Sequence, residues 1–393
     1  MIKAGVGISG NLDASEAAGE ASFQAMESGD LKRADWALVF CTFPHREKYK
    51  DILRTVCHIT HTTNLTGCSG IGVLTHSAEI EAEPGVCVLA VSSNSIKTSS
   101  FMCGDPTDEG FKAGVEIGKR LKPIGYQKAL LALLSDPFNF RPDLLFRGIE
   151  SELGYIPIVG ATASENPYIN ETAVFIGDNV SRRSVSGIIM KGEFDYSIGI
   201  TQGCQPIGNT FVITRCENNI IMELDNKPAY KVLKRHVPQT ILENPHDLIR
   251  TLFVGFSPES SGRKIVGGDY LIRNIMGINP ERGILAVGEN VRDGQTIIFA
   301  IRNPQMARED LKQMLERIKS SSDSEKPFEF GLFFNCCARG SSLYGQKGID
   351  TAYISHYLEG VPIIGFFGNS EFASLHGKNH LFTYTGVLVL ISE

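Results

Sequence analysis

The sequence predicts an α/β protein of mixed α+β type, with two domains of mixed β-sheets flanked by helices. Three observations lead to this fold class. The chain has 393 residues, more than one ordinary core accommodates. Short apolar runs alternate with amphipathic segments along most of its length. A strand-helix-strand-strand pattern recurs three times, and each copy reaches a glycine after a buried run.

Composition and charge exclude several classes of protein. Apolar residues make up 42% and charged residues 21% of the chain, as in a folded globular protein. The formal net charge of −6 and the lack of a basic stretch argue against binding to nucleic acid. Neither a signal-peptide core nor an apolar run of about 20 residues occurs, so we expect no membrane segment. The nine cysteines are scattered, which favours reduced thiols and a cytoplasmic protein.

The first copy of the pattern occupies the first 93 residues. Apolar runs bounded by glycine, proline or polar residues predict its strands, and apolar residues three and four apart predict its second helix. We expect strands at 2–9, 34–43 and 86–93, helices at 14–28 and 46–57, and a glycine-rich strand and loop at 64–76.

The second and third copies follow the same order. The second is expected to have strands at 128–134, 172–178 and 184–190, a helix at 142–153 and a loop at 157–166. The third is expected to have strands at 329–335 and 380–392, a helix at 348–358 and a loop at 362–371. A similar distance separates a mid-strand residue from the loop glycine in each copy, namely Val39 from Gly67, Leu133 from Gly160 and Phe333 from Gly365. We therefore expect these loops at equivalent corners of a structural repeat.

A region of different character separates the second and third copies. Alternating residues predict strands from about residue 200, with turns at 206–208 and 225–226 and a helix from Pro228. Three or four short strands at 263–302, a helix at 304–319 and a polar linker at 320–326 are expected to follow. This change of pattern predicts an N-terminal domain of residues 1–205 and a C-terminal domain of residues 206–393.

Several segments together resemble the FIST proteins, which have an N-terminal and a C-terminal FIST domain. They are CTFPH at 41–45, GCSG at 67–70, QGCQPIGNTFVITRCENNIIMELDNKPAY at 202–230, FNCCARGSSLYG at 334–345, PIIGFFGNSEF at 362–372 and TYTGVLVL at 383–390. The resemblance implies an intracellular sensory module for a small ligand, with amino acids as the usual proposal. Some relatives bind haem and sense nitric oxide. SEFAS at 370–374 stands where the family pattern implies GEIGP.

The segment FNCCARGSSLYG carries the most reactive side chains. Arg339 is expected to bind a ligand carboxylate through two hydrogen bonds, while Gly340 lets backbone N–H groups approach the same ligand. Alternatively, Arg339 ties the loop to a neighbouring acid such as Glu371. Cys336 is expected near the ligand as a structural thiol, because cysteine is often buried. A thiol-dependent hydrolase or amidotransferase-like enzyme that uses Cys336 or Cys337 is the alternative.

The segment GFFGNSE would complete the site. Phe366 and Phe367 are expected to wall its apolar part, and Glu371 to hold a ligand ammonium at the end away from the arginine. Asn369 and Ser370 would supply hydrogen bonds. Because parallel strands end at the same edge of a sheet, the two segments should emerge side by side. The other small-residue loops are weaker candidates for ligand contact, through Gly67, Cys68, Ser69, Thr162 and Ser164.

Cofactor signals are weak. His58 and His61, and also His376 and His380, are spaced as metal-ligand pairs, but isolated histidines are far more often structural. Haem needs only one axial histidine and therefore stays an alternative. GVGISG at 5–10 matches a dinucleotide-binding pattern, but its preceding strand is too short and no acidic residue closes a second strand. We therefore expect no metal and no cofactor, with haem as the alternative.

The sequence thus predicts a cytoplasmic sensory module that binds a small ligand, such as an amino acid, and signals to a protein partner. A haem-dependent gas sensor and a thiol enzyme are the alternatives from other classes. A cysteine nucleophile with no evident base and no fixed oxyanion donor favours the binding module over the enzyme.

Overall fold

Two compact units make up the computed structural model. It describes residues 1–104, 110–122, 128–138, 141–165, 169–237, 250–258, 270–321 and 326–393. The larger unit, which we call the core unit, comprises residues 1–200, 311–381 and 385–393. The smaller unit, which we call the inserted unit, comprises residues 201–310 and 382–384. The chain first leaves the core unit near the expected boundary at residue 205, and it returns to that unit after residue 310.

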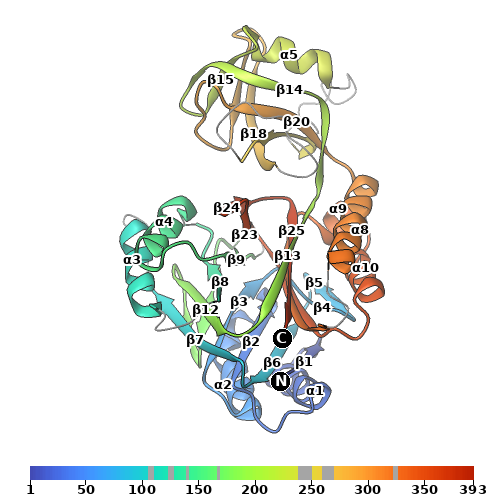
Figure 1. The fold of residues 1–393 in the computed structure, drawn as a ribbon. Coiled ribbons are helices and arrows are strands. Elements are labelled where there is room, and N and C mark those ends of the chain that lie inside the picture. Colours follow the sequence, from blue (N-terminus) through green and yellow to red (C-terminus); the bar gives the residue numbers. More distant parts are fainter. Residues whose placement is uncertain are drawn as a thin grey trace. The chain divides into compact units, whose positions relative to one another are not determined.

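Three six-stranded sheets form the core unit, and all three have the same order of strands. Figure 1 shows the ribbon of this unit, with its helices on the outside of the strands. Two parallel strands lie at the centre of each sheet, with antiparallel neighbours on both sides. Sheet 1 contains, in spatial order, β1 (Ile2–Ser9), β6 (Val86–Ser93), β2 (Trp36–Thr42), β3 (Leu65–Gly70), β10 (Val174–Ile176) and β11 (Asn179–Ser181).

Sheets 2 and 3 repeat this order with other segments. Sheet 2 contains β7 (Ile96–Cys103), β12 (Val185–Gly192), β8 (Ala129–Ser135), β9 (Ile158–Thr162), β23 (Glu371–Leu375) and β24 (Lys378–Phe382). Sheet 3 contains β13 (Asp195–Gln202), β25 (Thr385–Ser392), β21 (Phe328–Cys336), β22 (Ile363–Gly368), β4 (Gly72–Thr75) and β5 (Glu79–Glu81). The mixed α+β fold class predicted from the sequence is confirmed.

Helices connect the strands in the same order in each copy. A copy runs strand, helix, strand, helix, strand, hairpin, strand. Asp13 caps the first helix by accepting the N–H groups of Ser15 and Glu16. The helices are α1 (Ala14–Ser28), η1 (Phe43–Lys48) and α2 (Tyr49–Thr60) in copy 1, α3 (Gly110–Leu121) and α4 (Pro142–Leu153) in copy 2, and α8 (Pro304–Ser321), α9 (Gly340–Tyr344) and α10 (Ile349–Tyr357) in copy 3.

The expected repeat is confirmed at the level of strand register. The three mid-strand residues pair directly with the three glycines across the central parallel strands, as Val39 with Gly67, Leu133 with Gly160 and Phe333 with Gly365. A Cβ atom on any of these glycines would overlap the carbonyl oxygen of its partner. The expectation that the glycines lie in loops is wrong, because they lie inside β3, β9 and β22 and allow the close approach of the neighbouring strand.

The hairpin of each copy joins the sheet of a different copy, and we call this an exchange of hairpins. β4–β5 leaves copy 1 and completes sheet 3, β10–β11 leaves copy 2 and completes sheet 1, and β23–β24 leaves copy 3 and completes sheet 2. Every copy therefore gives one hairpin and receives another. A change at a hairpin tip acts on a sheet that belongs to a different copy.

The inserted unit interrupts copy 3 between β13 and α8. Its seven strands form a sheet that closes on itself, because β14 pairs with both β20 and β15. Alternate residues of these strands meet in one apolar core, which α5 (Ala229–His236) also joins. The strands, in spatial order, are β14 (Cys204–Glu217), β20 (Thr296–Arg302), β17 (Leu252–Phe256), β18 (Leu271–Asn279), β19 (Ile284–Val287), β15 (Ile220–Leu224) and β16 (Lys227–Pro228).

Some expected elements differ in the structure. The predicted turn at 206–208 is wrong, because β14 runs through it with a bulge where Gly208 adopts a φ of 74°. The turn at 225–226 and the helix after Pro228 are confirmed. β7, α3, β13, β17 and α9 were not predicted. Parts of the expected segments at 157–166, 263–302 and 320–326 lie outside the described residues.

Candidate functional site

The ends of β3, β9 and β22 meet within the core unit, and several of the predicted site residues lie there. Ser164 accepts the N–H of Ile71 at 2.8 Å and donates to the carbonyl oxygen of Phe367. Its own N–H reaches the carbonyl oxygen of Ser69 at 3.3 Å. One serine thus joins segments from all three copies.

A second set of hydrogen bonds joins copies 2 and 3. The N–H of Thr162 donates to the carbonyl oxygen of Ser370 at 2.8 Å, and the N–H of Ser370 donates to the hydroxyl of Thr162 at 3.0 Å. The N–H of Asn369 donates to the carbonyl oxygen of Thr162 at 3.1 Å. These groups satisfy one another and extend the pairing of β9 with β23.

The two phenylalanines expected to wall a pocket belong to the core. Phe366 lies against Phe40, with ring centroids 4.6 Å apart, and its edge faces Phe334 at 6.1 Å. Phe367 packs in the apolar cluster that includes Phe333. Both phenylalanines are buried, as are Gly67 and Cys68 of β3. A ligand could touch these side chains only if the strand ends opened.

Arg339 pairs with Asp350 rather than with Glu371. The guanidinium donates two hydrogen bonds of 2.9 Å to the two carboxylate oxygens of Asp350. Tyr344 accepts a third at 2.8 Å and donates its own hydroxyl to Asp350, which also accepts from Asn335. Both side chains of the ion pair are fully buried. The expected ion pair of Arg339 with Glu371 is therefore wrong, because the guanidinium binds the carboxylate of Asp350, at the start of α10, instead.

Burial dominates the electrostatics of this cluster. Burial alone would raise the pKa of Asp350, but the nearby guanidinium of Arg339 and hydrogen bonds from Arg339, Tyr344 and Asn335 hold it below its ordinary value. Glu371 accepts the hydroxyl of Thr385 at 2.7 Å, and its other oxygen has no hydrogen-bond partner among the described residues. Burial, followed by the neighbouring thiol of Cys336, raises the pKa of Glu371 well above its ordinary value.

Two further predicted site residues of this segment, Cys336 and Gly340, have structural roles. Cys336 is 2% exposed, and Gly340 has a φ of 54° at the start of α9. A Cβ on Gly340 would lie 2.8 Å from a carboxylate oxygen of Glu81, which accepts the N–H and the hydroxyl of Ser341. Because Gly340 has no side chain, it leaves space for the carboxylate of Glu81. Ligand contact by the residues named from the sequence stays a prediction.

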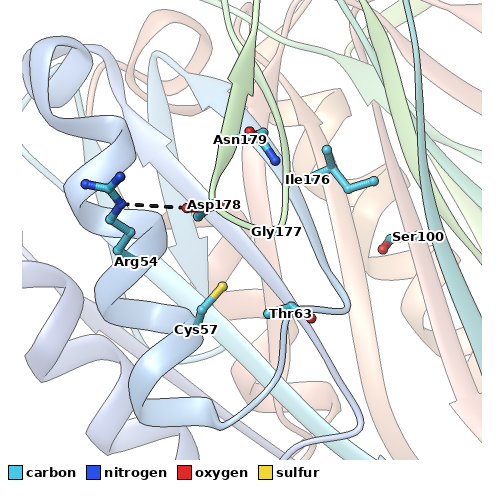
Figure 2. Close-up of a pocket in the computed structure, with 8 residues that line it drawn as sticks. All are labelled: Arg54, Cys57, Thr63, Ser100, Ile176, Gly177, Asp178 and Asn179. Atoms are coloured by element: carbon cyan, nitrogen blue, oxygen red, sulfur yellow. Dashed lines mark ion pairs between the residues drawn. The ribbon is translucent and has the colours of Figure 1, made fainter.

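A separate, solvent-open pocket lies where the tip of the β10–β11 hairpin meets α2 (Figure 2). We call it the hairpin pocket, and its volume is about 540 Å³. Two copies build it, since α2 belongs to copy 1 while β7 and the hairpin belong to copy 2. The pocket is lined by Arg54, Cys57, Thr63, Ser100, Ile176, Gly177, Asp178 and Asn179.

Local geometry fixes the walls of the hairpin pocket. His61 adopts a φ of 54° and ends α2, so that the chain turns past Thr63 into β3. Gly177, with a φ of 54°, turns the hairpin and donates its N–H to the carbonyl oxygen of Leu65 at 3.0 Å. Asn64 accepts the N–H of Ser100 at 3.1 Å and so holds the β7 wall in place.

Opposite charges flank the hairpin pocket. Arg54 and Asp178 approach to 3.6 Å, with side chains 59% and 50% exposed. Figure 2 shows this ion pair joining α2 to the hairpin tip. Cys57 also lines the pocket; burial, followed by the charge of Asp178, raises the pKa of its thiol to about 11. The thiol is therefore a neutral, weakly polar part of the wall at neutral pH.

Copies 1 and 2 differ at one helix position beside the exchanged hairpin. Cys57 stands ten residues before Gly67, as Glu150 of α4 stands before Gly160. In copy 2, Glu150 accepts the side-chain amide of Asn379 at 2.8 Å, and the same amide donates to the carbonyl oxygen of Ile156. Asn379 belongs to the exchanged hairpin β23–β24, so in copy 2 a side-chain hydrogen bond joins the helix to that hairpin. Cys57 is too short to make such a bridge.

Sequence reasoning missed Arg54 and Asp178. The signal for Asp178 was the Gly177-Asp178 pair between strand-forming residues, which is typical of a hairpin turn. No signal in the sequence showed that this hairpin joins the sheet of copy 1. Among the described residues, no cluster of three or more His, Cys, Asp or Glu residues is arranged to hold a metal ion. In the same part of the chain, no helix is both long and apolar enough to cross a membrane.

Family models match most of the chain, and several uncharacterized proteins are similar to it over their full length. The FIST N domain model matches residues 35–227, and the FIST C domain model matches residues 229–374. The chain is 28% identical over 397 residues to the uncharacterized protein Rv0628c of Mycobacterium tuberculosis, with 100% of both chains covered. It is 26% identical over 397 residues to the uncharacterized protein Mb0898c of Mycobacterium bovis, with 100% of this chain and 99% of that protein covered.

A more distant relative and a solved structure extend the comparison. The uncharacterized protein MJ1623 of Methanocaldococcus jannaschii is 23% identical over 359 residues, which cover 86% of this chain and 65% of that protein. Among solved structures, a cyanuric acid hydrolase aligns over 100% of both chains with a TM-score of 0.32 and 10% identity. A TM-score of this size carries no conclusion about fold or activity.

Proposed function

Because the chain belongs to the FIST family, whose domains are generally small-ligand sensory domains in signal transduction, we propose that it senses an amino acid or similar molecule. The ligand binds in the hairpin pocket. The observation that carries this proposal is the exposed pair of Arg54 and Asp178 at a pocket of about 540 Å³, a volume typical of small-molecule sites.

The ion pair is of the kind that a ligand can replace. An exposed pair of this separation contributes only about 0–1 kcal/mol to stability, so its loss costs the fold little. A zwitterion matches both partners, because its carboxylate can bind the guanidinium of Arg54 and its ammonium the carboxylate of Asp178. Thr63 and Ser100 offer hydroxyl groups to a polar side chain, while Ile176 and Cys57 offer apolar contact.

The exchange of hairpins gives such binding a consequence. A ligand held by Arg54 and Asp178 links α2 of copy 1 to a hairpin of copy 2. Within the chain, binding therefore stabilises the contact between repeat copies 1 and 2 relative to conformations in which the tip of the hairpin moves away from α2. A signalling protein that distinguishes these conformations would read the signal, and we propose such a partner for this chain in the cytoplasm.

A thermal-shift screen tests the proposal. The twenty amino acids would be compared with analogues that lack either the ammonium or the carboxylate group. We expect at least one amino acid to raise the melting temperature, because it binds only the folded state, and both analogues to lose the effect. Arg54→Ala and Asp178→Asn should abolish the shift.

The matched control for the screen is Arg147→Ala. Arg147 stands thirteen residues before Gly160, as Arg54 stands before Gly67, and it is also exposed on its helix. This variant should keep the full shift. No shift with any amino acid, or an unchanged shift in Arg54→Ala, would show that the hairpin pocket is not the site.

A thiol enzyme is less well supported. Cys336 is 2% exposed, and its sulfur lies 4.0 Å from the carbonyl oxygen of Asn369. A nucleophile needs access to its substrate, which the burial of Cys336 denies it. The alternative remains testable by native alkylation, in which slow labelling of both Cys336 and Cys337 is expected.

A further inference from the structure

The exchanged hairpin β4–β5 holds the two short helices of copy 3 through a pair of glutamates. Glu81 accepts the N–H of Ser341 at 3.0 Å and its hydroxyl at 2.7 Å, at the start of α9. Glu79 accepts the N–H of Gly348, and its other oxygen accepts the hydroxyl of Thr351 at 2.9 Å. Two side chains from copy 1 thereby bind the region that contains the buried Arg339–Asp350 pair.

Glu79 acts as a helix cap that comes from another part of the chain. α10 begins after Gly348, a glycine with a φ of 82° and no side chain that could cap the helix. The first N–H groups of a helix need acceptors from outside the helix, and Glu79 supplies one. The hydrogen-bonded contact between the β4–β5 hairpin and α10 therefore depends on the carboxyl group of Glu79.

The surroundings of Glu79 are unfavourable for a negative charge. Its own strand contributes Glu81, and α10 contributes Asp350, which Arg339 already neutralises through two hydrogen bonds. The nearby cation Lys347 pairs with the exposed Glu83 at 3.2 Å. Burial raises the pKa of Glu79 to about 7, against the lowering effect of the Gly348 N–H and the Thr351 hydroxyl; Glu81 and Asp350 raise it further.

We propose that Glu79 makes the β4–β5 hairpin a pH-sensitive latch, which holds α10 more firmly when its carboxyl group is protonated than when it is charged. A neutral carboxyl group keeps a carbonyl oxygen that accepts the Gly348 N–H. A charged group keeps the acceptors but bears the cost of burial beside two other acids. The latch is independent of the hairpin pocket, which uses a different hairpin and a different helix.

The direction of the effect follows from linkage. The unfolded or opened hairpin binds the proton with the ordinary glutamate pKa of 4.5, while the closed hairpin binds it more tightly. The closed state is therefore favoured at low pH, and it loses this advantage as the pH rises from about 4.5 through about 7. Because the side chain is partly exposed, we expect an effect of about tenfold on opening rather than the full shift.

Native-state hydrogen exchange of the full chain, followed by mass spectrometry between pH 5.5 and 8.5, tests the latch. Protection factors, corrected for the intrinsic pH dependence of exchange, are compared for α10 and for α1. We expect protection of α10 to fall about tenfold with rising pH, while protection of α1 changes much less. Glu79→Gln should remove the pH dependence of α10, and Glu359→Gln, a control at an exposed acid beyond the end of α10, should keep it.

A second variant keeps the test decisive if Glu79→Gln does not fold. Thr351→Val removes a hydroxyl that stabilises the charged form, and it should move the midpoint of the α10 transition to higher pH. A flat wild-type profile for α10, an equal fall in α1, or an unchanged slope in Glu79→Gln would overturn the proposal.

Discussion

Two arginine–aspartate pairs in the core unit have opposite characters. Arg339 and Asp350 form two hydrogen bonds of 2.9 Å with no exposure of either side chain. Arg54 and Asp178 approach only to 3.6 Å, and at least half of each side chain is exposed. The sequence presented the first arginine as the ligand-binding residue. The structure shows that the buried pair is bound by other protein groups, whereas the exposed pair lies beside a pocket.

The difference follows from what surrounds each pair. Removing one partner of a buried pair leaves a charge without compensation in a region of low dielectric constant. Removing one partner of an exposed pair leaves a charge in water, which solvates it. A buried pair therefore stabilises a local structure, and an exposed pair beside a pocket can exchange its partner for a ligand. Equal substitutions at the two arginines test this distinction.

The largest expected effect is on stability at the buried pair. Arg339→Met keeps most of the side-chain volume but leaves Asp350 buried and unneutralised, so the free energy of unfolding should fall by about 3–5 kcal/mol. The same substitution at the exposed pair, Arg54→Met, should change it by less than about 1 kcal/mol. Urea denaturation of both variants gives the two values. Similar losses for the two would remove the distinction between the pairs.

The second-largest expected effect on stability is at Gly365, the glycine in the central pair of parallel strands of copy 3. Gly365→Ala places a methyl group against the carbonyl oxygen of Phe333, so β21 and β22 must separate. We expect a loss of about 2–4 kcal/mol in the free energy of unfolding. Gly19→Ala is the control, because no atom lies within 4 Å of its Cβ position in α1, and it should stabilise the protein by up to about 1 kcal/mol.

Acid should weaken the buried pair specifically. The pKa of Asp350 lies below its ordinary value of 3.8 in the folded state, so its stabilising contribution is present above that pH. The contribution is lost as the pH falls through the lower, folded-state pKa. Unfolding free energies measured from pH 6 to pH 2 should therefore fall less steeply in Asp350→Asn than in the wild type. Parallel profiles would mean that the ionisation of Asp350 does not contribute.

The sequence predicted the repeated framework well for a physical reason. Each central pair of parallel strands has a glycine at one register position, and a similar spacing from the partner residue recurs at Gly67, Gly160 and Gly365. The boundaries of α1 and α4 also follow from caps and from Pro142 at the helix start. Local constraints of this kind can be recognised in the sequence from the residue types at particular positions.

The exchange of hairpins and the identity of the ion pairs were not predictable in this way. A hairpin pattern such as that around Asp178 shows a turn but not the sheet that the hairpin completes. Asp350 is eleven residues from Arg339, and only the packing of α9 and α10 brings them together. Glu371 seemed the natural partner because it closely follows β22, whose last residue pairs with Cys336 at the end of β21. Its carboxyl group instead accepts the hydroxyl of Thr385.

Calorimetric titration of the best amino acid from the screen tests the central claim most directly. The wild type, Arg54→Ala, Asp178→Ala and the double variant would form a double-mutant cycle, with Arg147→Ala as the control. Each single substitution should weaken binding at least tenfold, since each removes a charge-assisted hydrogen bond to the ligand, and the control should bind as the wild type does. Equal affinity in the wild type and Arg54→Ala would contradict the assignment of the hairpin pocket as the ligand site.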